Sequence, residues 1–159
     1  MRINTQRFGE IEVKDDRVIR FENGIPGFEH LRAFVIVHAQ QTAPVYWMQS
    51  VKEAGVALPV VDPFALVSDY SLEINDAEVE DLSLEDRADL LVLGVTVIPE
   101  DITKMTVNLA APVLVNTKKG VGRQIVMDNL RYSTRHPVYD GLMHALKGGN
   151  AHVGAHAQG

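Results

Sequence analysis

His136 is the residue of this sequence around which acid–base chemistry can be assembled. Asp128, Tyr132 and Arg135 lie close to it along the chain, so a general base with an orienting carboxylate can be drawn from this segment. The sequence contains no Gly-x-Ser-x-Gly elbow and no spaced pair of carboxylates to accompany such a base. A histidine before a proline is more simply explained as a hydrogen-bonded loop residue. We therefore predict that the chain is not an enzyme.

Two further patterns could bind a metal ion or a phosphate. His152 and His156 are four residues apart, a spacing that can chelate a metal on a helix, but glycines surround them. The run KKGVG from Lys118 to Gly122 lacks the spacing of a phosphate loop, and a hairpin turn explains it better. The chain has no cysteine, which removes disulfides, thiol nucleophiles and thiolate metal sites. We predict no cofactor and no metal.

The negative charge of the chain is concentrated in one segment. Residues 69–89 hold nine acidic residues and a single basic one, Arg87, so this segment carries −8 while the whole chain carries −6. Direct binding of nucleic acid by the segment is disfavoured, because phosphate contacts supply most of such affinity. The segment is either a solvated face or a docking site for a basic partner.

Length and hydropathy indicate one soluble domain of 159 residues. No apolar run approaches the roughly 18 residues of a membrane-spanning helix, and the first residues lack a signal peptide pattern. We expect a cytoplasmic protein that does not bind membranes. We expect the domain to cover residues 1–146, and residues 147–159, with four glycines and little to bury, to form a flexible tail.

The candidate residues described above must be positioned by short segments in which apolar residues alternate with other residues. In the segment 105–116, five apolar residues fall two apart, which places them on one face of an extended chain: Val107, Leu109, Ala111, Val113 and Val115. Pro112 interrupts this pattern and predicts an edge, a bulge or a break. The segment should form a hairpin with Arg123–Asp128 across the KKG turn.

Other strands are predicted where apolar runs alternate with turn residues. Residues 8–13 and 18–21 should form a first hairpin, and residues 90–99 should form a strand buried on both faces. Three more strands are expected at residues 34–37, 45–51 and 56–61. Helix starts are indicated at Asn75 or Asp76 and at Ser83, and a helix is plausible at Tyr139–Leu146. The fold class is mostly β, an antiparallel β-barrel or barrel-like sandwich with a short acidic helical insertion.

Seven phrases of the chain together resemble the FliW family of flagellar assembly factors. They are FGEIEV, FENGIPGFEHLRAFVIV, YWMQSV, VVDPF, VTVIPED, MTVNLAAPVLVN and RQIVMDNLRYSTRHPV. Their order and spacing extend the resemblance from about Arg2 to Tyr139, and nothing is carried over to the tail beyond it. The resemblance implies a non-enzymatic protein that binds flagellin in the cytoplasm. It also implies binding of the translational regulator CsrA, which antagonises RNA binding by CsrA and relieves repression of flagellin translation.

Two groups of residues are candidate protein-binding positions. The acidic segment would attract a basic RNA-binding protein and then repel RNA phosphates, and its candidate residues are Glu78, Glu80, Asp81 and Glu85. The second group is a rim formed by Asn23–Phe28 and Asn129–His136, with Phe28, Tyr132 and His136 as candidates. The alternatives are a merely solubilising helix and loops that only close the barrel. The alternative class of function is a small-ligand or flavin-binding β-barrel protein.

Overall fold

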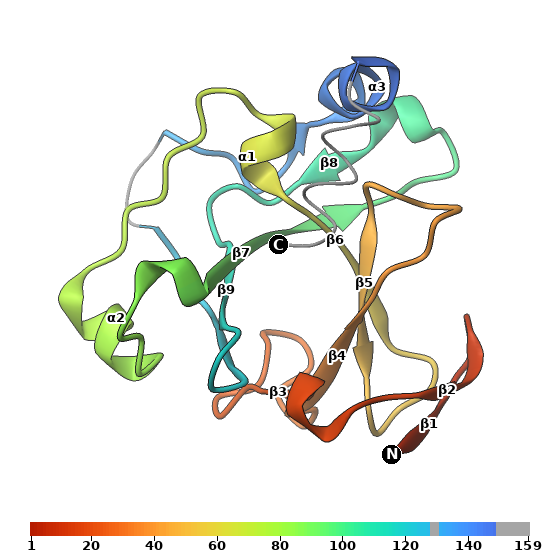
Figure 1. Ribbon diagram of the computed structural model, residues 1–159. Helices are drawn as coiled ribbons and strands as arrows, with labels where there is room; N and C mark the ends of the chain where they lie inside the picture. Colours follow the sequence, from red (N-terminus) through yellow and green to blue (C-terminus); the bar gives the residue numbers. More distant parts are fainter. Residues whose placement is uncertain (128–130, 149–159) are drawn as a thin grey trace.

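Seven strands close into a barrel in the computed structural model, which describes residues 1–127 and 131–148 (Figure 1). The barrel order is β7–β6–β5–β4–β3–β10–β9, and it closes because β9 pairs with β7 over Leu90–Leu93. All pairs are antiparallel except β3 with β10. The strands of the described residues are β1 Arg2–Thr5, β2 Gly9–Glu12, β3 Ile19–Arg20, β4 Ala33–Val37, β5 Tyr46–Ser50, β6 Ala57–Val61, β7 Leu90–Val97, β8 Thr106–Val107, β9 Val113–Asn116, β10 Val121–Gln124 and β11 His136–Pro137. The predicted mostly-β barrel is confirmed.

The barrel interior is filled with apolar side chains. One face of each strand from β3 to β7 and of β9 contributes to a single cluster, together with the loop that follows β3. Phe21 and Phe34 are fully buried in it and meet edge to face, with ring centroids 5.5 Å apart. Gly122 in β10 makes room for Phe21, since a Cβ there would lie 2.6 Å from the Phe21 ring. A second cluster covers the outside of the barrel, beneath the helices.

The segment 105–116 is broken, as Pro112 indicated. Both of its halves pair with β7, but Thr96 lies opposite Val107 whereas Leu93 lies opposite Val113, so three extra residues bulge out between β8 and β9. The Asn108 side chain accepts hydrogen bonds from the amides of Ala110 and Ala111 and fixes this bulge. The expectation that the five apolar residues share one face is wrong, because Val107 and Leu109 pack in the outer cluster and Val113 and Val115 in the interior one.

The return strand begins earlier than expected, because β10 starts at Val121. The predicted hairpin across Gly120 is present, with four residue pairs between β9 and β10. Beyond Gln124 only separate amides continue the pairing, as Ile125 donates to the Pro112 carbonyl and Met127 to that of Ala110. Asp128, the expected end of the strand, lies outside the described residues.

The first hairpin joins β1 to β2, which corrects the expected pairing of residues 8–13 with 18–21. Residues Asp15–Arg17 form a 3₁₀ helix rather than a tight turn, so β3 leaves this hairpin and pairs with β4 and β10. The hairpin instead packs its buried residues Ile3 and Val13 against Val35 on the outside of β4.

Three α-helices lie outside the barrel strands in the described part of the chain: α1 Pro63–Leu66, α2 Asp76–Asp81 and α3 Tyr139–Gly148. The expected acidic helix is α2, and α3 confirms the helix expected at 139–146 but extends two residues into the predicted tail. Residues 149–159, with His152 and His156, lie outside the described residues. None of the described helices has the length and apolarity needed to span a bilayer.

Two details of the predicted elements are corrected. Ser83 does not begin a helix, because it has a positive φ of 53° and follows the C-cap of α2, and the next helical turn is the 3₁₀ helix Arg87–Asp89 capped by Asp86. The strand expected at 90–99 ends at Val97, whose side chain is 63% exposed, so its last residues are not buried on both faces. A third 3₁₀ helix, Ile102–Lys104, joins β7 to β8.

Candidate protein-interaction surface

The acidic segment 69–89 is fixed to the outside of the barrel by two buried residues. Leu82, the C-cap of α2, is completely buried in the outer cluster. The Asn116 side-chain amide, at the end of β9, donates to the carbonyls of Leu82 and Ser83 at 3.0 and 3.2 Å. The Asn116 side-chain oxygen accepts from the amides of Lys118 and Lys119 in the next turn. One buried asparagine therefore joins the acidic segment to the β9–β10 hairpin.

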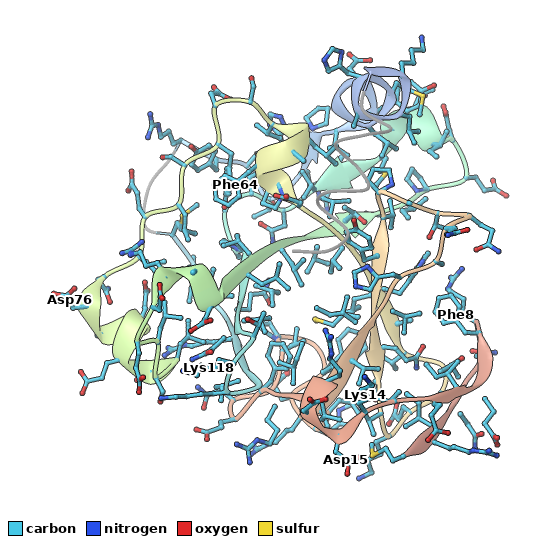
Figure 2. The ribbon with its side chains drawn as sticks, viewed as in Figure 1. Phe8, Lys14, Asp15, Phe64, Asp76 and Lys118 are labelled. Atoms are coloured by element: carbon cyan, nitrogen blue, oxygen red, sulfur yellow. The ribbon has the colours of Figure 1, made fainter. Side chains whose placement is uncertain are left out.

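Basic residues from other parts of the chain neutralise some of the acidic ones. Arg123 in β10 donates to the carboxylate of Asp81, and Lys119 donates to that of Glu85 at 3.0 Å. The hydrogen bond from Lys119, with the charges of Lys119 and Lys118, lowers the pKa of Glu85. Figure 2 shows Lys118 beside the acidic segment. The local charge is thus less negative than −8, because a barrel hairpin supplies cations that are distant in the sequence.

The four acidic candidates therefore have different roles in the structure. Glu78 forms a capping box with Asn75, in which each side chain accepts a hydrogen bond from the backbone amide of the other residue. Asp81 and Glu85 are paired as described above. Glu80 is exposed and forms no ion pair with any residue of the described chain. Asp76, one turn earlier on α2, is likewise exposed and points away from the barrel (Figure 2).

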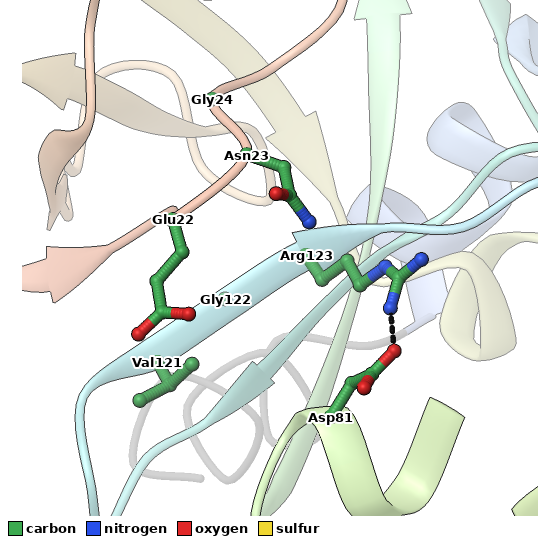
Figure 3. Close-up of a pocket in the computed structure, with 7 residues that line it drawn as sticks. All are labelled: Glu22, Asn23, Gly24, Asp81, Val121, Gly122 and Arg123. Carbon is green, nitrogen blue, oxygen red and sulfur yellow. Dashed lines mark hydrogen bonds and ion pairs between the residues drawn. The ribbon is translucent and has the colours of Figure 1, made fainter. Parts of the chain in front are cut away.

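A pocket of about 240 Å³ lies where the acidic segment meets the loop after β3 (Figure 3). The loop contributes Glu22, Asn23 and Gly24, β10 contributes Val121, Gly122 and Arg123, and α2 contributes Asp81. Arg123 and Asp81 form their ion pair on one side, and the Asn23 side chain points toward Arg123 (Figure 3). The structure thereby brings part of the predicted loop 23–28 next to the acidic segment, which sequence spacing did not suggest.

Phe28 is half-buried and takes part in shaping its own loop. Its amide donates to the Ile25 carbonyl at 2.7 Å, and its side chain packs against the interior cluster. Gly24 and Gly27 both have positive φ, and the Glu29 carboxylate accepts a hydrogen bond from the Gly27 amide. These turns and hydrogen bonds give the loop a defined shape against the interior cluster.

Tyr132 holds another loop in place. Its hydroxyl accepts a hydrogen bond from the Ser71 amide at 2.8 Å, and its ring lies 4.8 Å from that of Tyr70. The buried Tyr70 hydroxyl donates to the Leu109 carbonyl, and burial together with neighbouring Tyr132 raises the pKa of Tyr70 to about 12. His136 is half-buried in β11 and pairs with Val107 of β8. This arrangement braces the loop, and Asp128, the carboxylate considered beside His136, lies outside the described residues.

The expected rim is two separate surfaces. Tyr132 and His136 lie beside α1 and β8, whereas the loop that carries Phe28 follows β3 at the opposite end of the view in Figure 1. The two aromatic residues pack against different clusters. Asn129, the expected start of the second half of the rim, lies outside the described residues.

Three residues that sequence reasoning did not select belong to the surface: Glu22, Lys119 and Arg123. Lys119 and Arg123 form ion pairs with acidic residues 34 and 42 positions away in the sequence. No local sequence pattern predicts ion pairs over such separations. In the described residues, no group of three or more histidines and carboxylates is placed to hold a metal ion. The packed interior of the described barrel gives no support to the small-ligand or flavin-binding alternative.

Similarity to known proteins covers most of the chain. The family model described as FliW protein matches residues 2–138. A flagellar assembly factor FliW from Thermosipho africanus is 39% identical over 137 residues, which cover 86% of this chain and 94% of that protein. One from Thermoanaerobacter pseudethanolicus is 40% identical over 146 residues, covering 91% and 97%. A crystal structure of the flagellar assembly factor FliW is similar with a TM-score of 0.81 at 28% identity, covering 87% of this chain and 96% of that one.

Proposed function

The chain belongs to the FliW family, and from this premise we propose that it is a cytoplasmic flagellar assembly factor that binds flagellin and CsrA. CsrA that is bound to the factor no longer binds RNA, and repression of flagellin translation is thereby relieved. Flagellin occupies the factor when it accumulates and so returns CsrA to its RNA. This switch requires two binding equilibria that share one factor and no chemical step.

The observation that carries the CsrA part of this proposal is the exposed charge of α2. Asp76 and Glu80 are four residues apart, so they lie on one face of the helix, and neither is neutralised by a described residue. The capping box and the Asn116 contacts hold this helix in a fixed position. A basic RNA-binding protein is attracted to such a face, and the remaining negative field then opposes RNA phosphates.

Phe28, Tyr132 and His136 enter the proposal as contacts at two distinct surfaces. Because Phe28 packs against the interior cluster and Tyr132 against the outer one, each surface serves a different partner or a different part of one partner. The half-buried aromatic rings present apolar area that a partner can cover. Phe28→Ala and Tyr132→Ala should each weaken capture of CsrA or flagellin, with each protein titrated separately.

Co-elution and competition test the function directly. The purified chain is mixed with CsrA, with flagellin, and with both, and the complexes are separated by size-exclusion chromatography. The proposal expects a complex with each protein alone and release of CsrA as flagellin is added. A chain that co-elutes with neither protein at micromolar concentrations contradicts the proposed function.

A further inference from the structure

The pocket between α2 and the loop after β3 contains one carboxylate that no cation of the described chain compensates. Arg123 is its single basic lining residue, and the Asp81 carboxylate already pairs with it. Glu22 is exposed at the pocket edge and forms no hydrogen bond or ion pair through its side chain within the described residues. The lining therefore carries two negative charges against one positive charge, and the excess lies at Glu22 (Figure 3).

The chemistry of this lining favours a cation. An incoming basic group finds the Glu22 carboxylate next to Val121 on one side of the pocket and the Asp81 carboxylate on the other side, with the Asn23 side chain between them (Figure 3). An anion is disfavoured, because the Arg123 guanidinium already pairs with Asp81 and the carboxylates of Glu22 and Asp81 would repel the anion. The volume of about 240 Å³ is sufficient for the end of a basic side chain.

We propose that this pocket receives an arginine or lysine side chain of the basic protein partner. The inference rests on the proposed function, because it locates one anchoring contact of a partner drawn to the acidic segment. The exposed acids Asp76 and Glu80 lie on the helix that ends at the pocket, so the same partner is attracted by α2 and positioned by Glu22. Specificity then comes from a shaped site formed by three elements, and α2 supplies the long-range attraction.

The direct test uses a small probe of the basic side chain. The 15N-labelled chain is titrated with N-acetyl-arginine methylamide at low salt, and amide shifts are followed for Asn23, Gly24 and Gly122. We expect saturable shifts at these residues in the unaltered chain and in Glu100→Gln, and loss of them in Glu22→Gln. Glu100 is the matched control because it is exposed and has no ion pair in the described chain.

The partner provides the second measurement. CsrA should bind Glu22→Gln about three- to fivefold more weakly than it binds the unaltered chain or Glu100→Gln. Absence of shifts in the unaltered chain, or equal shifts in Glu22→Gln, overturns the pocket proposal. If the probe shifts appear as expected but CsrA does not bind the unaltered chain, the pocket stands and the proposed function fails. If CsrA binds all three proteins equally, the pocket has no part in its capture and the proposal is overturned.

Discussion

Asp81, the last residue of α2, forms an ion pair with Arg123 of β10, 42 residues further along the chain. The pair links the acidic segment to a barrel strand and closes one side of the pocket that Glu22 borders. Arg123 also neutralises the Asp81 carboxylate, which the sequence alone counts among the free negative charges of the acidic segment. Acidic residues without an ion pair in the described chain remain on α2, at Asp76, Glu78 and Glu80, and at the pocket, at Glu22; others in the segment are Asp69, Asp86 and Asp89.

The first prediction concerns the energy of this ion pair. A double-mutant cycle with Asp81→Asn and Arg123→Gln should give a coupling free energy of about 0.5 kcal/mol, because both side chains are partly exposed to water. Urea denaturation measures the free energy of unfolding for the four proteins. Arg20→Gln, an exposed arginine on neighbouring β3, is the control for loss of a positive charge. A coupling of zero would show that the pair does not anchor α2.

The second prediction concerns Asn116, which should contribute far more to stability than the ion pair. Asn116→Ala removes two donors to carbonyls of the acidic segment and an acceptor for two amides of the hairpin turn, at a buried position. We expect a loss of about 2–3 kcal/mol in the free energy of unfolding and faster amide exchange in α2. Asn4→Ala, at an exposed position of β1, should change stability little. Unaltered exchange in α2 would contradict the anchoring role.

The third prediction separates the exposed acids of α2 from exposed acids elsewhere on the chain. Asp76→Asn combined with Glu80→Gln should weaken CsrA binding about three- to tenfold at low salt, and it should flatten the dependence of affinity on salt. Asp16→Asn combined with Glu100→Gln removes the same charge from exposed positions elsewhere and serves as the control. Isothermal titration at several salt concentrations gives both quantities. Equal affinities and equal salt slopes in the two double variants would leave α2 as a solubilising helix.

The fourth prediction uses the pKa of Tyr70. Its folded-state pKa of about 12 lies above the ordinary value of 10, so the folded protein holds this proton more tightly than the unfolded chain. The corresponding stability is complete below pH 10 and is lost as the pH rises from 10 toward 12. Tyr70→Phe should cost about 1 kcal/mol at neutral pH, through the lost hydrogen bond to Leu109, and should weaken the decline above pH 10.

Denaturation curves between pH 8 and 11.5 measure this effect, with Tyr139→Phe as the matched tyrosine substitution. The decline in stability above pH 10 should be steeper in the unaltered chain than in Tyr70→Phe. Parallel declines in these two proteins would show that Tyr70 does not carry the pH dependence.

The sequence by itself determined the local features of this protein. Alternation predicted the strands, Asn75 or Asp76 marked the start of α2, and Pro112 marked the break before β9. Each of these depends on residues a few positions apart, because side-chain period, capping and a missing amide hydrogen act within one element. Wrong expectations arose where a strand changes partner, as when β3 leaves the first hairpin and pairs with β4 and β10.

Only the tertiary structure decided how the acids are used and which loops meet. Barrel closure through β9 and β7 places Arg123 against Asp81 and brings Glu22 to the border of the same pocket, and it separates Phe28 from Tyr132. The sequence shows nine acidic residues between positions 69 and 89, but it does not show which of them are neutralised by cations from distant parts of the chain. Charge pairing depends on distance in space, and the closed register of the barrel, set by many strands together, fixes those distances.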